Sequence, residues 1–102
     1  MGIELIWEEE NSDELARLND PESLVEQFLP SDSDKEFSCL RFVDPYGDTI
    51  FNRLQLPVLL LELERCAAKP HEPPVAEHLS AAVALVKKAQ DHVHTYVRFV
   101  GD

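Results

Sequence analysis

The residues best suited to chemistry are two histidines separated by a single residue, His92 and His94. Asp91 directly precedes the first of them. On an extended strand both imidazoles would point to one face, about 7 Å apart. Imidazole is a good zinc ligand, but a zinc site needs three or four convergent donors. His78 is a candidate third ligand, yet nothing in its spacing requires it to approach. We therefore predict no metal or cofactor, and a histidine near a helix C-terminus is explained by the helix dipole alone.

The cysteines and serines give no sign of nucleophilic catalysis. Cys66 falls on the apolar stripe of an expected helix and Cys39 lies in an apolar run, which indicates two buried, inert thiols. The pattern G-x-S-x-G is absent from the sequence. The glycine-rich patterns that bind phosphate are absent as well, and the chain has only 3 glycines to build one. We therefore predict a protein that is not an enzyme.

Charge is the most unusual property of the sequence. Twenty acidic against nine basic side chains give a formal net charge of −11, and twelve of the acids but only two of the bases lie in residues 1–36. Such a field repels phosphate backbones and anionic membranes, and it attracts cationic proteins. We predict a basic protein partner, with no nucleic acid and no membrane. Acidic composition also serves solubility, so the charge alone leaves that simpler interpretation open.

The densest acidic cluster is the predicted binding surface. Its five carboxylates all lie within seven consecutive positions, and they are Glu8, Glu9, Glu10, Asp13 and Glu14. We predict that they dock a basic protein. Tyr46 and Asp48, in the turn around Pro45 and Gly47, are predicted as further contacts. Asp48 has a second interpretation, in which it caps backbone N–H groups of that turn.

Hydrophobic periodicity predicts the elements that position these groups. Strands are expected at residues 3–7, 37–43, 49–52 and 93–100. Helices are expected at residues 54–68 and 75–92, with a shorter one at residues 12–18. Residues 22–29 are expected to form a second short helix, with an irregular strand as the alternative. The turn at residues 44–48 would join two of the strands as a β-hairpin, and the final strand would pair beside it.

This order predicts an α+β fold in a single domain that spans residues 1–102. The expected architecture is a three- or four-stranded, mostly antiparallel sheet with two main helices packed on one face. The start of the chain lacks the basic and apolar regions of a signal peptide, and the longest apolar run, residues 57–61, is too short to span a membrane. The expected location is cytoplasmic.

Residues 44–55, DPYGDTIFNRLQ, resemble a segment of small bacterial proteins to which no activity is attached. In length, acidity and α+β character, the whole chain also resembles the immunity proteins that accompany secreted bacterial toxins. The resemblance implies a non-catalytic inhibitor that binds and neutralises a basic toxin domain. Two alternatives stay open. One is a small metal-binding or enzymatic domain that uses His92 and His94, and the other is a homo-oligomeric regulatory subunit, with a homodimer as its simplest form.

Overall fold

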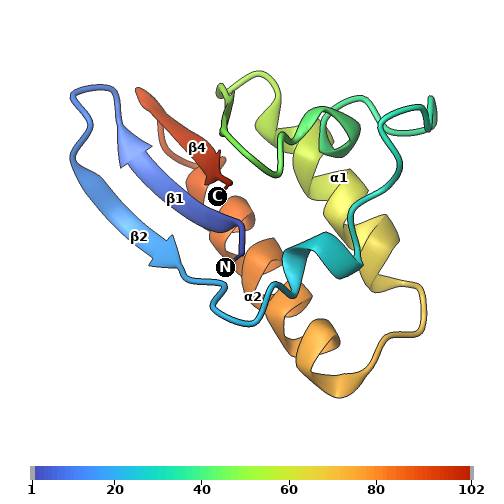
Figure 1. The fold of residues 1–102 in the computed structure, drawn as a ribbon. Helices are drawn as coiled ribbons and strands as arrows, with labels where there is room; N and C mark the ends of the chain where they lie inside the picture. Colours follow the sequence, from blue (N-terminus) through green and yellow to red (C-terminus); the bar gives the residue numbers. More distant parts are fainter. Residues whose placement is uncertain (1, 102) are drawn as a thin grey trace.

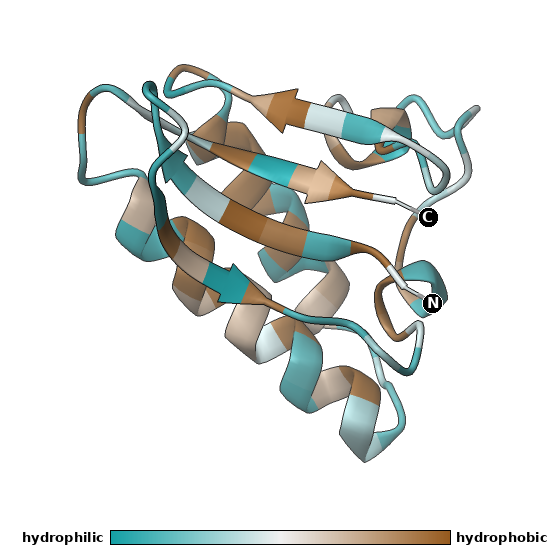
Figure 2. Ribbon diagram, turned by 60° about the vertical axis from the view of Figure 1, so that its left-hand side comes forward, coloured by the Kyte–Doolittle hydropathy of each residue, from teal (hydrophilic) through white to brown (hydrophobic). Residues whose placement is uncertain are grey.

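The computed structural model describes residues 2–101, which form a four-stranded sheet and two long helices (Figure 1). The strands are β1 (Glu4–Glu9), β2 (Glu14–Leu18), β3 (Asp48–Phe51) and β4 (Thr95–Val100). The helices are α1 (Leu56–Ala67) and α2 (Pro73–Ala89), with short 3₁₀ turns η1 (Val25–Gln27) and η2 (Leu40–Phe42). The sheet order is β2-β1-β4-β3 and each neighbouring pair is antiparallel. Both helices lie on one side of the sheet (Figure 2), which confirms the predicted fold class.

Alternation along the strands sends one row of side chains toward the helices. Leu5 and Trp7 of β1 lie in register with Phe99 and Val97 of β4, and all four are buried. Phe51 of β3 packs edge-to-face on Phe99, with ring centroids 5.6 Å apart. Burial of each such side chain contributes about 1.5–3 kcal/mol, so this row anchors the sheet on the helices.

The two helices form where the periodicity predicts them. In α2 the buried residues recur every three or four positions, and they are Val75, Leu79, Ala82, Val86 and Ala89. This stripe faces the sheet, and α1 packs alongside α2. The start of α1 is fixed by a capping box. Asn52 Oδ1 accepts the Leu54 and Gln55 N–H groups at 3.0 and 3.1 Å, while Gln55 Oε1 accepts the Asn52 N–H at 2.8 Å.

The helix predicted at residues 12–18 is wrong, because this segment forms the edge strand β2. Ser12 adopts a left-handed backbone conformation with φ of 74°, and the Glu9 N–H donates to the Asp13 carbonyl at 2.9 Å. These features close a tight hairpin that returns the chain along β1. Ala16 and Leu18 then pack against the core. Pairing with β1 therefore outweighs the weak helix propensity of a five-residue segment.

The strand predicted at residues 37–43, and with it the β-hairpin to residues 49–52, is also wrong. Glu62 of α1 is buried, and its carboxylate accepts the N–H groups of Ser38, Cys39 and Leu40 at 2.7–3.2 Å. These backbone donors are thereby taken by a side chain instead of a strand, and the segment turns into η2. β3 pairs with β4 instead, and β4 also pairs with β1.

A second buried carboxylate shapes the chain after β2. Asp20 accepts the N–H groups of Ile3, Leu24 and Val25 at 2.6–3.1 Å, which ties this segment to the start of β1. The helix predicted at residues 22–29 shortens to the single turn η1. Among the helices of residues 2–101, none has the length and apolar character needed to cross a membrane.

Candidate functional site

The face of the sheet that points away from the helices, here called the open face, carries a ladder of charged side chains. Ile6 of β1 lies at its centre, in register with Arg17 of β2 and Arg98 of β4. Ile6 is only 2% exposed although no helix covers it. The long apolar stems of arginine suit this position, since they can cover an aliphatic side chain while their charged groups stay in water.

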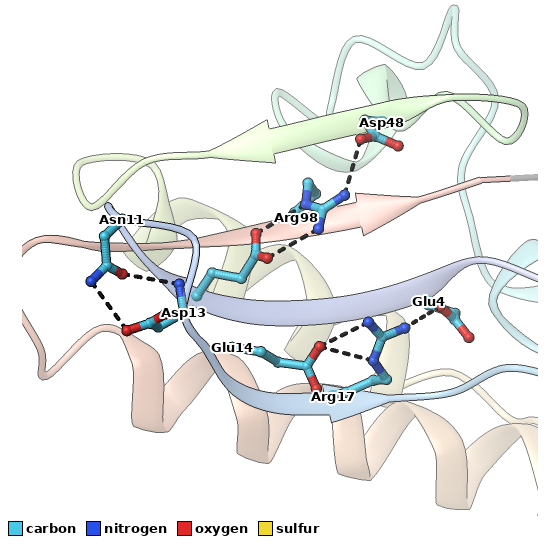
Figure 3. A network of polar contacts seen from close by, with 8 residues as sticks. Glu4, Asn11, Asp13, Glu14, Arg17, Asp48 and Arg98 are labelled. Carbon is cyan, nitrogen blue, oxygen red and sulfur yellow. Dashed lines mark hydrogen bonds and ion pairs between the residues drawn. The ribbon is translucent and has the colours of Figure 1, made fainter.

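Arg98 is the centre of an ion-pair network that joins three strands (Figure 3). Its Nε and Nη2 donate to the two carboxylate oxygens of Glu8 at 3.0 Å each, and its Nη1 donates to Asp48 Oδ2 at 3.1 Å. Glu8 is 5% exposed. The hydrogen bonds from Arg98 lower the pKa of Glu8 despite the opposing effect of burial, and they raise the pKa of Arg98.

Arg17 forms the second part of the ladder. It pairs with Glu4 across the β1–β2 ladder, and with Glu14, three positions away on its own strand, at 2.8 Å (Figure 3). Hydrogen bonding from Arg17 lowers the pKa of Glu14 and raises that of Arg17. Two arginines thus engage four carboxylates, so each of these carboxylates has an arginine partner and half of their formal charge is compensated within the chain.

The acidic hairpin, residues 9–13 between β1 and β2, keeps its charge. Asn11 bridges to Asp13 by two hydrogen bonds of 2.9 and 3.1 Å, which fixes the turn (Figure 3). Glu9 and Asp13 have no ion pair to any basic side chain in residues 2–101. Within residues 2–101, the side chain of Glu10 has an imidazole as its ion-pair partner, His94 Nδ1 at 3.1 Å. Three carboxylates at this end of the sheet therefore have no lysine or arginine partner.

An apolar hollow of about 530 Å³ lies next to the acidic hairpin, at the end of the open face. This end hollow is lined by Glu10, Ile50, Asn52, Arg53, Leu54, Val93, His94, Thr95 and Tyr96. Ile50, Leu54 and Val93 are more than half exposed. Exposed aliphatic side chains that gather beside uncompensated carboxylates are a feature of protein-binding surfaces.

The structure does not bring the seven predicted binding residues to one surface. Glu9, Glu10 and Asp13 remain together on the acidic hairpin. Glu8, Glu14 and Asp48 instead lie within the arginine ladder, because strand alternation separates Glu8 from Glu9 in a contiguous acidic run.

Tyr46 lies apart from both groups. It is 81% exposed and sits in the turn before β3, next to the end of β4, whereas the acidic hairpin lies beside the start of β4. The six residues of β4 separate the two by close to 20 Å at the usual strand rise of about 3.3 Å per residue. Tyr46 and the acidic hairpin therefore lie toward opposite ends of β4.

The histidines do not converge. His92 packs its ring edge-to-face on Trp7, 4.9 Å between centroids, and its Nδ1 lies 3.0 Å from the Lys88 carbonyl at the end of α2. His94 faces Glu10, and His78 lies 3.9 Å from the buried Asp20. Residues 2–101 contain no group of three or more His, Cys, Asp or Glu side chains arranged to hold a metal ion.

Both cysteines are buried and unpaired. Burial raises the pKa of Cys39 to about 11 and also raises the pKa of Cys66. Thiols in such surroundings stay protonated at neutral pH and are poor nucleophiles. Their placement in the core agrees with the interpretation of the sequence.

Two structural carboxylates, Asp20 and Glu62, were missed by sequence reasoning. For Glu62 a signal existed, because helical spacing places it on the inner stripe with Leu59, Leu63 and Cys66. A charged residue at such a position predicts a buried group with dedicated donors. Asp20 precedes a proline in an acidic segment, and nothing in that pattern distinguishes it from its exposed neighbours.

Comparison of the chain with protein-family models, with curated proteins and with solved structures finds no match. Function is therefore inferred from the surface itself. The acidic hairpin can accept lysine or arginine side chains, and the end hollow can accept an aliphatic or aromatic side chain next to them.

Proposed function

We propose that this chain is a non-catalytic acidic binding protein of the immunity type, which binds a cationic toxin domain and neutralises it. One observation carries the proposal. Within the part of the chain that the structure describes, the carboxylates of the acidic hairpin have no lysine or arginine partner and lie beside an apolar hollow, whereas most carboxylates on the adjoining open face are paired with arginine. Three carboxylates thus lie beside a hollow where an apolar anchor can also be buried, with Arg53 as a basic residue of its lining.

The acidic hairpin supplies long-range attraction. Complementary charge raises association rates from about 10⁵–10⁶ M⁻¹s⁻¹ toward 10⁸–10⁹ M⁻¹s⁻¹ at low salt, and it disfavours acidic competitors. A toxin domain that acts on a polyanionic substrate needs a cationic substrate-binding surface. Glu9, Glu10 and Asp13 would occupy that surface and exclude the substrate.

The end hollow supplies the short-range part of the affinity. Burial of one aliphatic or aromatic side chain there contributes about 1.5–3 kcal/mol. Tyr96 and His94 offer polar groups at its wall, so a partner side chain with an apolar body and a polar tip would also fit. The partner is thus a cationic protein with an apolar side chain among its lysines or arginines.

The test is capture of the partner from the native host on the immobilised chain, followed by an assay of the partner's activity. The hairpin-reversed variant is Glu9→Lys/Glu10→Lys/Asp13→Lys. The matched control is Glu22→Lys/Asp32→Lys/Glu77→Lys, which changes the net charge equally at three acidic residues that are exposed and carry no ion pair in residues 2–101.

The proposal expects a cationic protein that binds one-to-one and loses its activity in the complex. Wild type and the matched control would capture it, and the hairpin-reversed variant would not. Equal capture by both triple variants would remove the hairpin from the binding surface. A captured protein that keeps full activity in the complex would contradict the inhibitory role.

A further inference from the structure

Helix α1 and the turn that leads into it share a second apolar face, on the side that does not pack against the core. The inner face is formed by Leu56, Leu59, Leu60, Leu63 and Cys66. Leu54, Val58 and Leu61 follow a separate spacing of four and three positions, and they are 77%, 41% and 59% exposed. A helix that is apolar on two sides is typically buried on two sides. This outer stripe, defined as Leu54, Val58 and Leu61, is therefore a contact surface without a partner in the described chain.

The helical phase of the stripe extends back to Arg53. The Leu56 N–H donates to the Asn52 carbonyl at 3.1 Å, an i to i−4 bond, and the Asn52–Gln55 capping box closes the same turn. Arg53 and Glu64 thus belong to one helical run, about three turns apart. Three turns bring them back to the same flank of the helix, so one end of this flank is positive and the other negative.

Neither charge is neutralised within the chain. Arg53 and Glu64 are both exposed, and neither forms an ion pair in residues 2–101. When two antiparallel helices are related by a two-fold axis, equivalent flanks of the two helices face each other. The two flanks run in opposite directions, so the start of one lies against the end of the other. That arrangement brings each Arg53 opposite a Glu64, and the outer stripe against itself.

We propose that the outer stripe of α1 docks a second copy of this chain, as an antiparallel and isologous helix pair centred near Val58. Leu54 of each copy then packs near Leu61 of the other, and two Arg53–Glu64 pairs close the flank. The apolar stripe and its two flanking charges are self-complementary, as a two-fold interface requires. This inference does not rest on the proposed function, although Arg53 and Leu54 also line the end hollow.

The net charge of −11 on each copy opposes association, but its reach is short. At physiological ionic strength the screening length is about 8 Å, so distant carboxylates contribute little. The acidic hairpin and most of α1 lie on different sides of the molecule (Figure 1). Charges in direct contact across the helix pair are opposite in sign and are the least screened, so they favour the antiparallel arrangement.

The first test measures molar mass by light scattering over a protein concentration series. Wild type is expected to change from monomer to dimer. Val58→Asp places an unpaired carboxylate in the apolar contact and is expected to weaken dimerisation by roughly tenfold or more. Leu15→Asp is the matched control, because Leu15 is also 41% exposed but lies on β2, away from the stripe. A wild type that stays monomeric throughout would overturn the proposal.

The second test uses charge reversal. Arg53→Glu and Glu64→Arg each place like charges opposite one another, so each variant alone is expected to remain largely monomeric. Mixing the two single variants restores opposite charges at both contacts and is expected to restore dimers. The double variant Arg53→Glu/Glu64→Arg is expected to dimerise by itself.

The antiparallel arrangement would be refuted if each single variant dimerised as strongly as wild type. It would also be refuted if mixing the two single variants did not restore dimers. Equal weakening by Val58→Asp and Leu15→Asp would refute the outer stripe as the contact. Circular dichroism of every variant separates loss of association from loss of fold. Capture of the toxin-class partner is measured separately, so failure of either proposal leaves the other standing.

Discussion

Glu8 and Glu9 are adjacent in the chain, yet their surroundings differ almost completely. Glu8 is buried on the open face and paired with Arg98 through both carboxylate oxygens, whereas Glu9 points to the other side of the strand and has no ion pair in residues 2–101. The charge of Glu8 thus contributes to folding, and that of Glu9 remains available to a partner. Whether an acidic residue stabilises the fold or remains available to a partner therefore depends more on its local ion-pair partners than on its residue type.

The Glu8–Arg98 pair predicts a specific pH dependence of stability. The fold lowers the pKa of Glu8 below its ordinary value of 4.5. Its stabilising contribution is therefore fully present above pH 4.5 and is lost as pH falls through the lowered pKa. Replacement by Glu8→Gln is expected to cost roughly 1–3 kcal/mol at pH 7, with a smaller difference from wild type at acidic pH.

Urea denaturation of wild type and Glu8→Gln between neutral and acidic pH measures this effect. Glu22→Gln, at an exposed glutamate without an ion pair in residues 2–101, serves as the control. A constant free-energy difference between Glu8→Gln and wild type across this pH range would show that the ion pair does not carry the stabilisation.

Among substitutions of a single carboxylate, we expect replacement of Glu62 to lower the free energy of unfolding most. Glu62→Ala leaves the buried backbone donors of Cys39 and Leu40 without their acceptor. Each unsatisfied donor costs about 1–3 kcal/mol, so the free energy of unfolding is expected to fall by roughly 3 kcal/mol or more. Glu77→Ala, at an exposed position of α2, is expected to change it by less than about 0.5 kcal/mol. Urea midpoints that differ little between these two variants would contradict the role of Glu62.

At the scale of elements, the sequence is most informative where periodicity is long. Both main helices and the strands at each end of the chain can be predicted from apolar spacing, because many apolar positions fall on one face of the same element. The segments predicted wrongly are short, and distant groups decide their structure. β2 is a strand because β1 offers an open edge, and η2 is a turn because the carboxylate of Glu62 binds its backbone.

The candidate site was only partly predictable for the same reason. The acidic run locates the hairpin, and alternation would have separated Glu8 from Glu9 once the run was assigned to a strand. The pairing of Glu8 with Arg98 joins residues ninety positions apart, so it depends on the β1–β4 register. The end hollow likewise combines residues from the hairpin, β3, the turn before α1, and the start of β4 with the two residues before it, which no local pattern predicts.

The backbone conformation of Ser12, in the turn of the acidic hairpin, suits glycine better than serine. Ser12 has a φ of 74°, a conformation that costs L-residues about 1–2 kcal/mol and costs glycine almost nothing. Ser12→Gly is therefore expected to raise the free energy of unfolding by roughly 0.5–1 kcal/mol. Ser33→Gly, at a loop position outside the left-handed region, is expected to be neutral or destabilising. Thermal melts of both variants check the sign, and a loss of stability in Ser12→Gly would contradict the turn geometry.

At the scale of the whole molecule, the two long helices cover one face of the sheet and leave three distinct surfaces on the rest. In the arginine ladder every carboxylate is paired with an arginine. The acidic hairpin with the end hollow offers unpaired charge and an apolar anchor, and α1 offers a second apolar stripe. Leu54 borders both the end hollow and the stripe. The two proposed contacts are thus neighbours, and variants at Val58 and at Glu9 separate them.

The most direct test of the central claim is a calorimetric titration of the captured cationic partner with three forms of the chain. These are wild type, the hairpin-reversed variant and the matched control with the same net charge. The hairpin-reversed variant is expected to bind roughly tenfold or more weakly. The matched control is expected to bind like wild type, and added salt is expected to weaken binding of wild type more than binding of the hairpin-reversed variant. Equal affinity of the two triple variants would contradict recognition through the acidic hairpin.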